Sequence, residues 1–472
     1  MFFKQIYEPG LAHASYMVGC QATGEVMVID AKRDIDTYLD IARQERLRIT
    51  HLTETHIHAD FLSGTRELAA VTGATMFLSD EGGPEWQYEF PHTGLKDNDT
   101  FMVGNIKVQV MHTPGHTPEH ISLLVTDTPA TRDVPIMMFT GDFVFVGDVG
   151  RPDLLEKVAG HRGTMDAGAR QMFASLRRFN SLPDHIQVHP AHGAGSACGK
   201  ALGAIPSSTV GYEKLVNWAL QHTDEEEFVN ALLDGQPEPP RYFAHMKVLN
   251  KVERNLRTEV QQPHLLSLQD LSEALADGTM VVDTRVKTAF ANGHIPNTVN
   301  IQNNKAFSTW AGWMIDYDKP FAIIADDRTI DDVVRKLMRI GLDNILGYRP
   351  GIDGWHEGHH ALATTAEIPH DEFVSRYDND DVVVIDVRST NEYVSGHIPG
   401  ARHLHAGYLL QHLGEIPRDK VVVISCQAGD RSSIATSLLQ REGFHNIVNY
   451  APGYAGWRAA GCPYETGTTI DA

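Results

Sequence analysis

The sequence predicts an α/β protein of three domains: a strand-rich first half, then two copies of a smaller α/β domain built on a parallel sheet. Three observations predict this fold class. The 472 residues exceed one ordinary core, since domains commonly take roughly 100 to 200 residues. In the first half, strand-like runs alternate with loops rich in His, Asp, Gly or Pro. In the second half, short motifs recur after 102 or 103 residues.

The first half contains apolar runs of strand length, each followed by a polar loop. Such runs, bounded by turn residues, are typical of buried strands, and a rigid sheet can position the residues of the loops. The pattern becomes helical after Ala201, and we expect Leu249–Gln262 to complete a helical extension, so the first domain is predicted to span 1–262. The expected strands cover residues 26–30, 49–53, 106–111, 121–125 and 136–140.

A repeat divides the second half into two domains, predicted at 263–362 and 363–472. Asp283-Thr284-Arg285 recurs 103 positions later as Asp386-Val387-Arg388, and the glycine- and tryptophan-containing segment 351–355 recurs at 453–457. This period is too long for a solenoid. Apolar runs that alternate with helical stretches predict a parallel sheet in each copy, with strands at 280–282, 321–324, 382–385 and 421–424.

Composition and charge narrow the class of protein. Hydrophobic residues make up 42% and charged residues 21%, and no run of about 18 apolar residues could span a bilayer, so we expect no membrane association. The net charge of -21 repels phosphate backbones and argues against nucleic acid as a partner. Four cysteines without disulfide-framework spacing suit a reducing compartment. The amino terminus does not resemble a signal peptide, and we expect a cytoplasmic protein.

Imidazole and carboxylate side chains gather in the loops of the first half. Such groups suit divalent iron or zinc. A His-x-His-x-Asp segment alone would be a weak signal, but here a loop histidine, a Gly-Asp pair and a Pro-Ala-His segment follow it in order. The candidate residues are His56, His58, Asp60, His116, Asp142 and His192.

This ordered set resembles the metallo-β-lactamase superfamily over roughly residues 1 to 260, which implies an αββα sandwich. The glyoxalase II type hydrolases of that superfamily continue the motif with a further histidine and bind two metal ions. Here the corresponding residue is Phe61. One ligand of the second metal is therefore missing, and a single metal is expected.

Within the superfamily the chain is more similar to the persulfide dioxygenases, in which two histidines and one aspartate hold one ferrous iron. The resemblance assigns one Fe(II) to His56, His116 and Asp142, a set that leaves positions open for substrate and dioxygen. Zinc can replace iron on the same ligands. The remaining candidates then orient the ligands or touch substrate: His58, Asp60 and His192.

Two further residues near this set have open roles. Arg151 is a candidate for holding the carboxylate of a thiol cofactor by bidentate hydrogen bonds, and a structural salt bridge is the alternative. Cys198 lies just beyond His192 and could reach the metal pocket, although buried free cysteines are usually inert.

The segment Cys426-Gln427-Ala428-Gly429-Asp430-Arg431 predicts a second chemistry. A strand delivers Cys426 into a short loop whose backbone N–H groups can face inward, with the start of a helix from about Ser432 beneath them. Arg431 adds a charge that favours the thiolate or binds an anionic sulfur donor. Cysteine phosphatases need five residues between Cys and Arg, whereas four occur here. The loop resembles the rhodanese family over about residues 365 to 464, and Cys426 and Arg431 are its catalytic candidates.

The first copy of the repeat cannot perform this chemistry. Its corresponding stretch, 323–328, contains no cysteine, and none occurs between Cys198 and Cys426. We therefore expect an inactive rhodanese homologue that acts as a scaffold.

The whole chain resembles the fused persulfide dioxygenase-sulfurtransferases of bacteria, the CstB type. The resemblance implies that a low-molecular-weight thiol persulfide and dioxygen yield sulfite, that Cys426 carries sulfane sulfur, and that thiosulfate is the final product. Two alternatives stay open: a zinc-dependent thioester hydrolase of glyoxalase II type, and a rhodanese part that only binds a sulfur carrier. The sequence determines neither the preferred thiol nor the oligomeric state, and it is compatible with a homo-oligomer.

Overall fold

The computed structural model describes residues 1–159, 163–200, 202–355 and 361–467. It divides into two compact units, one of Met1–Val260 with Met338–Gly341 and the other of Gln261–Leu337 with Leu342–Ala472. Among the described residues, no helix is both long enough and apolar enough to cross a bilayer.

The first unit contains two six-stranded sheets. The first sheet follows the strand order β1-β2-β3-β4-β5-β6, with β3 to β6 parallel to one another. The strands of this sheet are β1 (Phe2–Glu8), β2 (His13–Cys20), β3 (Glu25–Ile29), β4 (Arg48–Thr53), β5 (Thr75–Ser79) and β6 (Thr93–Leu95). The second sheet is mostly antiparallel, in the order β12-β11-β10-β9-β8-β7. It contains β7 (Thr100–Val103), β8 (Ile106–His112), β9 (Ile121–Asp127), β10 (Met137–Gly141), β11 (Gln187–Pro190) and β12 (Ser208–Thr209).

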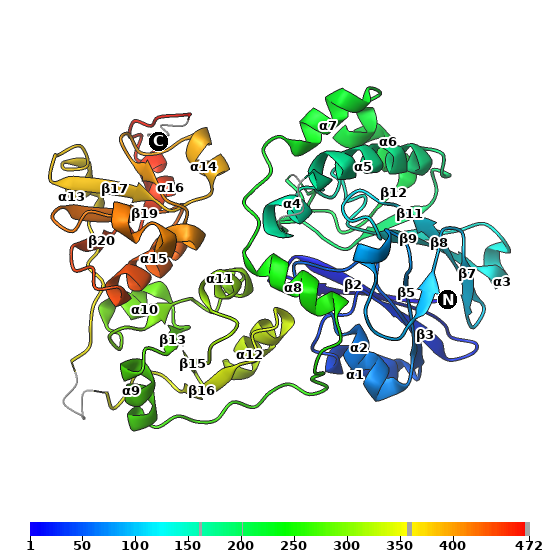
Figure 1. The fold of residues 1–472 in the computed structure, drawn as a ribbon, viewed down its shortest axis with the longest axis horizontal. Coiled ribbons are helices and arrows are strands. Elements are labelled where there is room, and N and C mark those ends of the chain that lie inside the picture. The colour runs from blue at the N-terminus through cyan, green and yellow to red at the C-terminus, as the bar shows by residue number, and fades with distance from the viewer. Residues whose placement is uncertain (160–162, 201, 356–360, 468–472) are drawn as a thin grey trace. The chain divides into compact units, whose positions relative to one another are not determined.

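Helices cover the outer faces of the two sheets (Figure 1). Alternate residues of each strand point to opposite faces, so Met27 and Ile29 of β3 pack between the sheets while Val28 packs on the other side. On that side lie α1 (Asp36–Glu45) and α2 (Thr65–Thr72). The outer face of the second sheet packs against α5 (Thr164–Asn180) and α7 (Glu225–Leu233). The expected αββα sandwich is confirmed.

The shorter elements among the described residues of this unit are α3 (Thr128–Thr131), α4 (Leu154–Ala159), α6 (Val210–Val216), α8 (Tyr242–Lys251) and the 3-10 turns Pro84–Trp86 and Trp218–Gln221. The expected helical extension is confirmed in α6 to α8, but the helix predicted over Leu249–Gln262 is wrong. The last helix instead begins at Tyr242 and ends at Lys251, because the side chains that pack inward are Tyr242, Phe243 and Met246.

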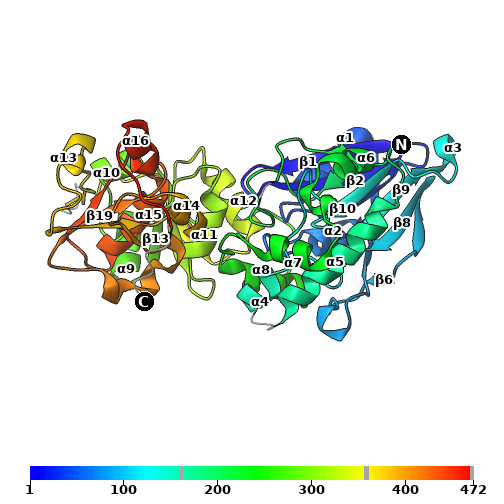
Figure 2. The same cartoon turned by 90° about the horizontal axis from the view of Figure 1, so that it is seen from above.

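The second unit contains two four-stranded sheets that are parallel throughout, as predicted. The first copy consists of α9 (Leu268–Ala276), β13 (Met280–Asp283), α10 (Lys287–Asn292), β14 (Val299–Asn300), α11 (Phe307–Met314), β15 (Phe321–Ile324), α12 (Ile330–Arg339) and β16 (Ile345–Arg349). The second copy consists of α13 (His370–Val374), β17 (Val382–Asp386), α14 (Thr390–Ser395), β18 (Arg402–His403), β19 (Val421–Ser425), α15 (Asp430–Arg441), β20 (Ile447–Asn449) and α16 (Gly453–Ala459), with 3-10 turns at Ala406–Gln411 and Leu413–Glu415. In Figure 2, α15 lies beside β19.

The two copies repeat their local contacts as well as their motifs. In the first copy Arg285 pairs with Asp283 and donates to the carbonyl of Gly293. In the second copy Arg388 pairs with Asp386 and donates to the carbonyl of Gly396. The recurring Asp-x-Arg and Gly-His-Ile-Pro segments are therefore structural, and they fix the loop after the first strand of each sheet.

Candidate functional site

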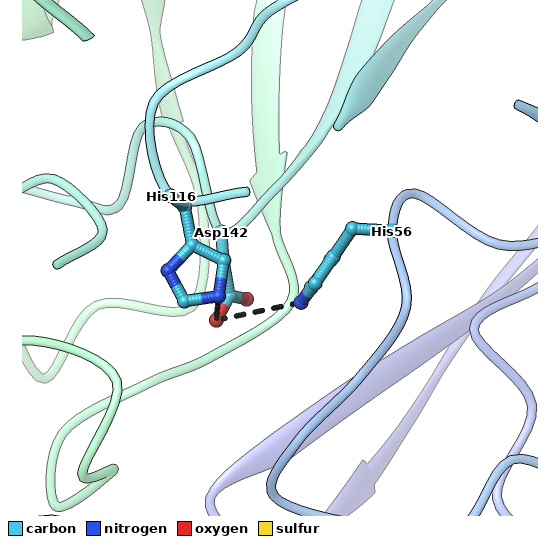
Figure 3. A group of neighbouring side chains, drawn as sticks. All are labelled: His56, His116 and Asp142. Atoms are coloured by element: carbon cyan, nitrogen blue, oxygen red, sulfur yellow. Dashed lines mark ion pairs between the residues drawn. The ribbon is translucent and has the colours of Figure 1, made fainter. Parts of the chain in front are cut away.

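The predicted ligands converge at one edge of the sandwich. His56 follows β4, His116 lies in the loop between β8 and β9, and Asp142 directly follows β10. Nε2 of His116 lies 3.5 Å and Nε2 of His56 lies 4.0 Å from Oδ2 of Asp142 (Figure 3). All three side chains are buried, and one ligand atom from each lies within 4.8 Å of the others. Two imidazoles and one carboxylate thus face a common point.

A glycine allows Asp142 to reach this position. Gly141 has a φ of 51°, and a Cβ on it would come within 2.5 Å of Oγ of Thr55 and 2.6 Å of Nε2 of His120. The Gly-Asp pair seen in the sequence is therefore a steric requirement, because the backbone passes against two side chains that support the site.

Hydrogen bonds fix the histidine tautomers so that Nε2 faces the centre. His116 donates from Nδ1 to the carbonyl of Arg151 at 2.8 Å, and His192 donates from Nδ1 to the carbonyl of Ala12 at 3.1 Å. Because a carbonyl only accepts, a neutral imidazole in this arrangement keeps its lone pair on Nε2. Nδ1 of His56 lies 3.0 Å from Oγ of Thr55.

Burial and charge set the protonation states that metal binding requires. Burial lowers the pKa of His116 to about 3 and takes the pKa of His56 well below its usual value. Both are therefore neutral near pH 7, the form that binds metals. Burial raises the pKa of Asp142 to about 6. A bound cation would favour the ionised carboxylate.

His58 has a different role from its neighbour His56. Its Nε2 lies 3.0 Å from Oδ1 of Asp30, a carboxylate that also accepts hydrogen bonds from the backbone and hydroxyl of Thr55. Burial lowers the pKa of His58, but the Asp30 carboxylate outweighs burial and raises it to about 9. The pair of His58 and Asp30 thus supports the loop that carries His56.

A second cluster lies beside the first. One ligand atom from each of Asp60, His192 and Cys198 lies within 4.8 Å of the others, and all three residues are buried. Nε2 of His192 lies 3.2 Å from Oδ2 of Asp60 and 3.4 Å from Oδ1 of Asp142. Burial and the Asp142 carboxylate raise the pKa of the Cys198 thiol well above its usual value.

Phe61 limits what this second cluster can hold. The fully buried ring lies with its centroid 4.4 Å from that of His58 and 4.1 Å from that of His13. A hydrocarbon ring supplies no ligand, so the second cluster lacks the nitrogen that a histidine would have offered.

The buried polar atoms of the two clusters fit a divalent metal. Nε2 of His56, both carboxylate oxygens of Asp60 and Nε2 of His192 are buried and make no hydrogen bond within the described part of the chain. Such atoms are costly to bury alone, and nitrogen and carboxylate donors satisfy Fe(II) or Zn(II).

Arg151 is engaged by the protein itself. Its Nε and Nη2 donate to the two oxygens of Asp153 at 2.7 Å each, and further hydrogen bonds reach the carbonyls of Ala197 and Pro237. The guanidinium is fully buried. Of the two roles considered from the sequence, the structural salt bridge is the one these contacts support.

Sequence reasoning missed several residues around the metal centre. His13 is buried beside Phe61, His120 accepts a hydrogen bond from the backbone of Asp142, and Asp30 supports His58. The ammonium of Lys247, in α8, lies 4.8 Å from the Trp86 ring centroid and lowers the pKa values of His56 and His116. No motif marks these residues, because tertiary packing alone brings them to the site.

The cysteine loop lies between β19 and α15. Cys426 is 1% exposed, and its Sγ accepts a hydrogen bond from the backbone N–H of Gly429 at 3.1 Å and lies 3.5 Å from Oγ of Ser432. The helix begins at Asp430, so its positive end faces the sulfur. In the first copy Ala325, fully buried, follows the equivalent strand β15.

Arg431 is paired with Glu392 rather than free. Its Nη1 and Nη2 donate to the two carboxylate oxygens at 2.5 and 2.7 Å. Burial opposes ionisation of Glu392, but the guanidinium outweighs it and lowers the pKa of Glu392 to about 2. Gln427 accepts from Nη1 of Arg388 at 3.3 Å, a contact that the sequence did not indicate.

Comparisons with known proteins place the chain in a family. The model of the metallo-beta-lactamase superfamily matches residues 9–192, and that of the rhodanese-like domain matches 267–358 and 369–460. A solved metallo-beta-lactamase structure from Staphylococcus aureus subsp. aureus COL is 44% identical, with a TM-score of 0.67, and the match covers 74% of this chain and 99% of that one. The chain therefore belongs to the metallo-β-lactamase superfamily and carries two rhodanese-like domains.

More distant relatives match the chain in part. A hydroxyacylglutathione hydrolase of Prochlorococcus marinus (strain MIT 9211) is 27% identical over 172 residues, which cover 36% of this chain and 62% of that enzyme, less than two thirds of its length. The structure of ETHE1 from Myxococcus xanthus is 26% identical, covers 52% of this chain and 100% of that one, and has a TM-score of 0.41. The family models thus define a metallo-β-lactamase domain fused to two rhodanese-like domains, and the reaction is inferred from the sites.

Proposed function

We propose that the chain is a non-heme iron persulfide dioxygenase coupled to a rhodanese sulfurtransferase, of the CstB type, that acts in sulfide detoxification. The observation that carries the proposal is the set of His56, His116 and Asp142 beside Phe61, on the same chain as Cys426. Two histidines and one carboxylate leave open positions for a substrate and dioxygen. All four cysteines are free, which suits action in the cytoplasm.

Iron held by these ligands would supply dioxygen activation, which zinc, having no redox chemistry, cannot. The substrate is a low-molecular-weight thiol persulfide. Its terminal sulfur gives four electrons to dioxygen, and water supplies the third oxygen of sulfite. The sulfur–sulfur bond breaks, and the thiol and two protons leave.

The surrounding residues would orient the substrate and exclude water. Phe61 packs its hydrocarbon ring against His58, and the charge of Lys247, which lowers the pKa of His116, would attract an anionic persulfide. Burial lowers the pKa of this lysine, while Glu119 opposes that shift. Arg151 holds His116 through its own carbonyl group and so acts on the ligand rather than on the substrate.

Cys426 would then receive sulfane sulfur from a second persulfide. Attack of sulfite on the outer sulfur of the Cys426 persulfide forms the sulfur–sulfur bond of thiosulfate and releases the Cys426 thiolate. The N–H of Gly429 stabilises that thiolate as leaving group.

Oxygen uptake tests the dioxygenase. Anaerobically prepared, iron-loaded protein is mixed with glutathione persulfide, and His116→Ala serves as the matched variant. We expect rapid uptake that the variant lacks. Absence of uptake with several thiol persulfides, despite one bound iron per chain, would contradict the proposal.

A thioester hydrolase of glyoxalase II type is the second candidate, favoured by the cluster of Asp60, His192 and Cys198 beside the first set. There, zinc would activate water to split a thioester. Two bound zinc ions per chain, with turnover of a glutathione thioester and none of a persulfide, would identify this activity.

A further inference from the structure

The hydrogen bond to Cys426 depends on the orientation of one peptide group. The N–H of Gly429 that donates to Sγ belongs to the peptide formed by Ala428 and Gly429. Gly429 has a φ of 90°, and a Cβ on it would come within 2.6 Å of the carbonyl oxygen of Ala451. This turn is therefore held in a conformation that only glycine adopts easily, and its peptide needs support to keep the N–H on the sulfur.

The opposite end of the same peptide is bound by the first rhodanese copy. Nζ of Lys287 donates to the carbonyl oxygen of Ala428 at 2.5 Å. In a planar trans peptide, the C=O and N–H bonds point in opposite directions. A donor that fixes the carbonyl on the outside of the loop therefore directs the N–H inward, at Sγ. Because the donor is an ammonium, it also polarises the peptide and strengthens the N–H as a donor.

Lys287 is itself held in place by a neighbour in each copy. Its backbone N–H donates to Oε1 of Gln302 at 2.9 Å, at the start of α10. Nζ also contacts Oδ1 of Asp430 at 2.6 Å, and the other oxygen of Asp430 accepts from Asn304 at 3.2 Å. Lys287 and Asn304 of the cysteine-less copy thus both bind the loop that carries Cys426.

The contact acts through orientation more than through net charge. Asp430 compensates the ammonium of Lys287, and the pair is partly exposed, with 25% and 49% of the two side chains accessible. Solvent screens the field of such a pair at the sulfur. What remains is the hydrogen bond to Ala428, which a side chain of similar length without a donor, such as methionine, cannot make.

We propose that Lys287 is a positioning residue for Cys426, so that the cysteine-less copy contributes to the sulfur-transfer site instead of serving only as a scaffold. Lys287 holds the Ala428–Gly429 peptide with its N–H on Sγ, which stabilises the thiolate. The inference rests on the proposed function in one respect, that the Cys426 thiolate serves in sulfur transfer. The reactivity of the thiol itself can be measured whether or not sulfur is transferred.

The test is the rate at which iodoacetamide alkylates Cys426 in the full chain, followed by peptide mass spectrometry from pH 5 to pH 10. Cys462 of the same molecule is the internal reference thiol. Lys287→Met removes the donor at nearly constant length, and Lys287→Arg retains one. Lys336→Met is the matched control, because Lys336 lies in the same copy with Nζ on Asn303 and Asp332 and makes no contact with the loop in the described structure.

Loss of a hydrogen bond to the charged form should move the midpoint of the alkylation profile up by about half to one pH unit, and slow alkylation at pH 7 about three- to ten-fold. We expect this in Lys287→Met, and rates within about two-fold of the original in Lys287→Arg and Lys336→Met. An unmoved midpoint in Lys287→Met, or an equal shift in Lys336→Met, would overturn the inference. If the midpoint shifts in Lys287→Met but the original protein forms no thiosulfate, the proposed sulfur transfer is contradicted. The positioning role of Lys287 is then still supported.

Discussion

Arg151→Met separates a structural role of this arginine from a role in substrate binding. The change removes the two hydrogen bonds to Asp153 and those to the carbonyls of Ala197 and Pro237, all at a fully buried guanidinium. Removing one partner of a buried pair typically costs about 3 to 5 kcal/mol. Lys157 remains 2.9 Å from Asp153 and compensates part of the charge, so we expect about 3 kcal/mol.

Thermal unfolding gives the assay. In a unit of this size, a loss of about 3 kcal/mol lowers the melting temperature by about 6 to 12 °C. The side-chain contacts of Arg151 position its backbone carbonyl, which accepts the hydrogen bond from His116, so iron occupancy measured by mass spectrometry should fall as well. The control is Arg43→Met, whose exposed partner is Asp40 and whose melting temperature should not change. A variant with unchanged melting temperature and iron content but a raised KM for glutathione persulfide would refute the structural reading and make Arg151 a substrate anchor.

Three further predictions follow from the two sites. Phe61→His should raise bound zinc from one toward two ions per chain, because it adds a nitrogen ligand next to the cluster of Asp60 and His192. Elemental analysis counts the zinc, and a count that stays at one would contradict the role given to Phe61. Cys426→Ser should abolish thiosulfate formation while sulfite accumulates, and the control Cys462→Ser should form thiosulfate as before. Persistent thiosulfate in Cys426→Ser would favour a rhodanese part that only binds a sulfur carrier. The pKa of Glu392 lies at about 2, below its usual 4.5, so its pairing with Arg431 should add stability above about pH 4.5 that is lost as pH falls toward 2. The melting-temperature difference from Glu392→Gln should therefore be constant near neutral pH and shrink in acid, and a difference that grows in acid would contradict the pairing.

Much of the fold was predictable because its signals are local. The parallel strands 382–386 and 421–425 each begin with four consecutive apolar residues, and the internal repeat indicates that the same domain occurs twice. The helix at the end of the first domain was misplaced, since its boundaries depend on which side chains pack inward. Tyr242, Phe243 and Met246 bury against the domain, while the residues after Lys251 do not continue the helix.

The metal ligands were predictable for a similar reason. His56 follows a strand of the first sheet, and His116 and Asp142 follow strands of the second. Each lies in a short motif, and the resemblance of these ordered motifs to a known family indicated the set of His56, His116 and Asp142 without coordinates. The supporting residues could not. Asp30 lies within hydrogen-bond distance of His58, and the charge of Lys247 in α8 lowers the pKa of His116, although neither residue stands at a recognisable spacing from the ligands in the sequence.

The pairing of Arg431 was also hidden in the sequence. Its spacing from Cys426 indicated a charge for the thiolate or for an anionic donor, but Glu392, 39 positions earlier, binds both terminal nitrogens. Likewise, no pattern in the sequence around Lys287 indicated that its side chain donates a hydrogen bond to a backbone carbonyl in the second copy of the repeat.

The sulfur and oxygen balance of one reaction tests the central claim, that one chain both oxidises and transfers persulfide sulfur. Iron-loaded protein is given glutathione persulfide in air-saturated buffer, and oxygen, sulfite and thiosulfate are followed together. The account predicts one dioxygen consumed and one thiosulfate formed for every two persulfides, and one sulfite per dioxygen in Cys426→Ser. Hydrolysis of a glutathione thioester by the same preparation, without oxygen uptake from the persulfide, would contradict it.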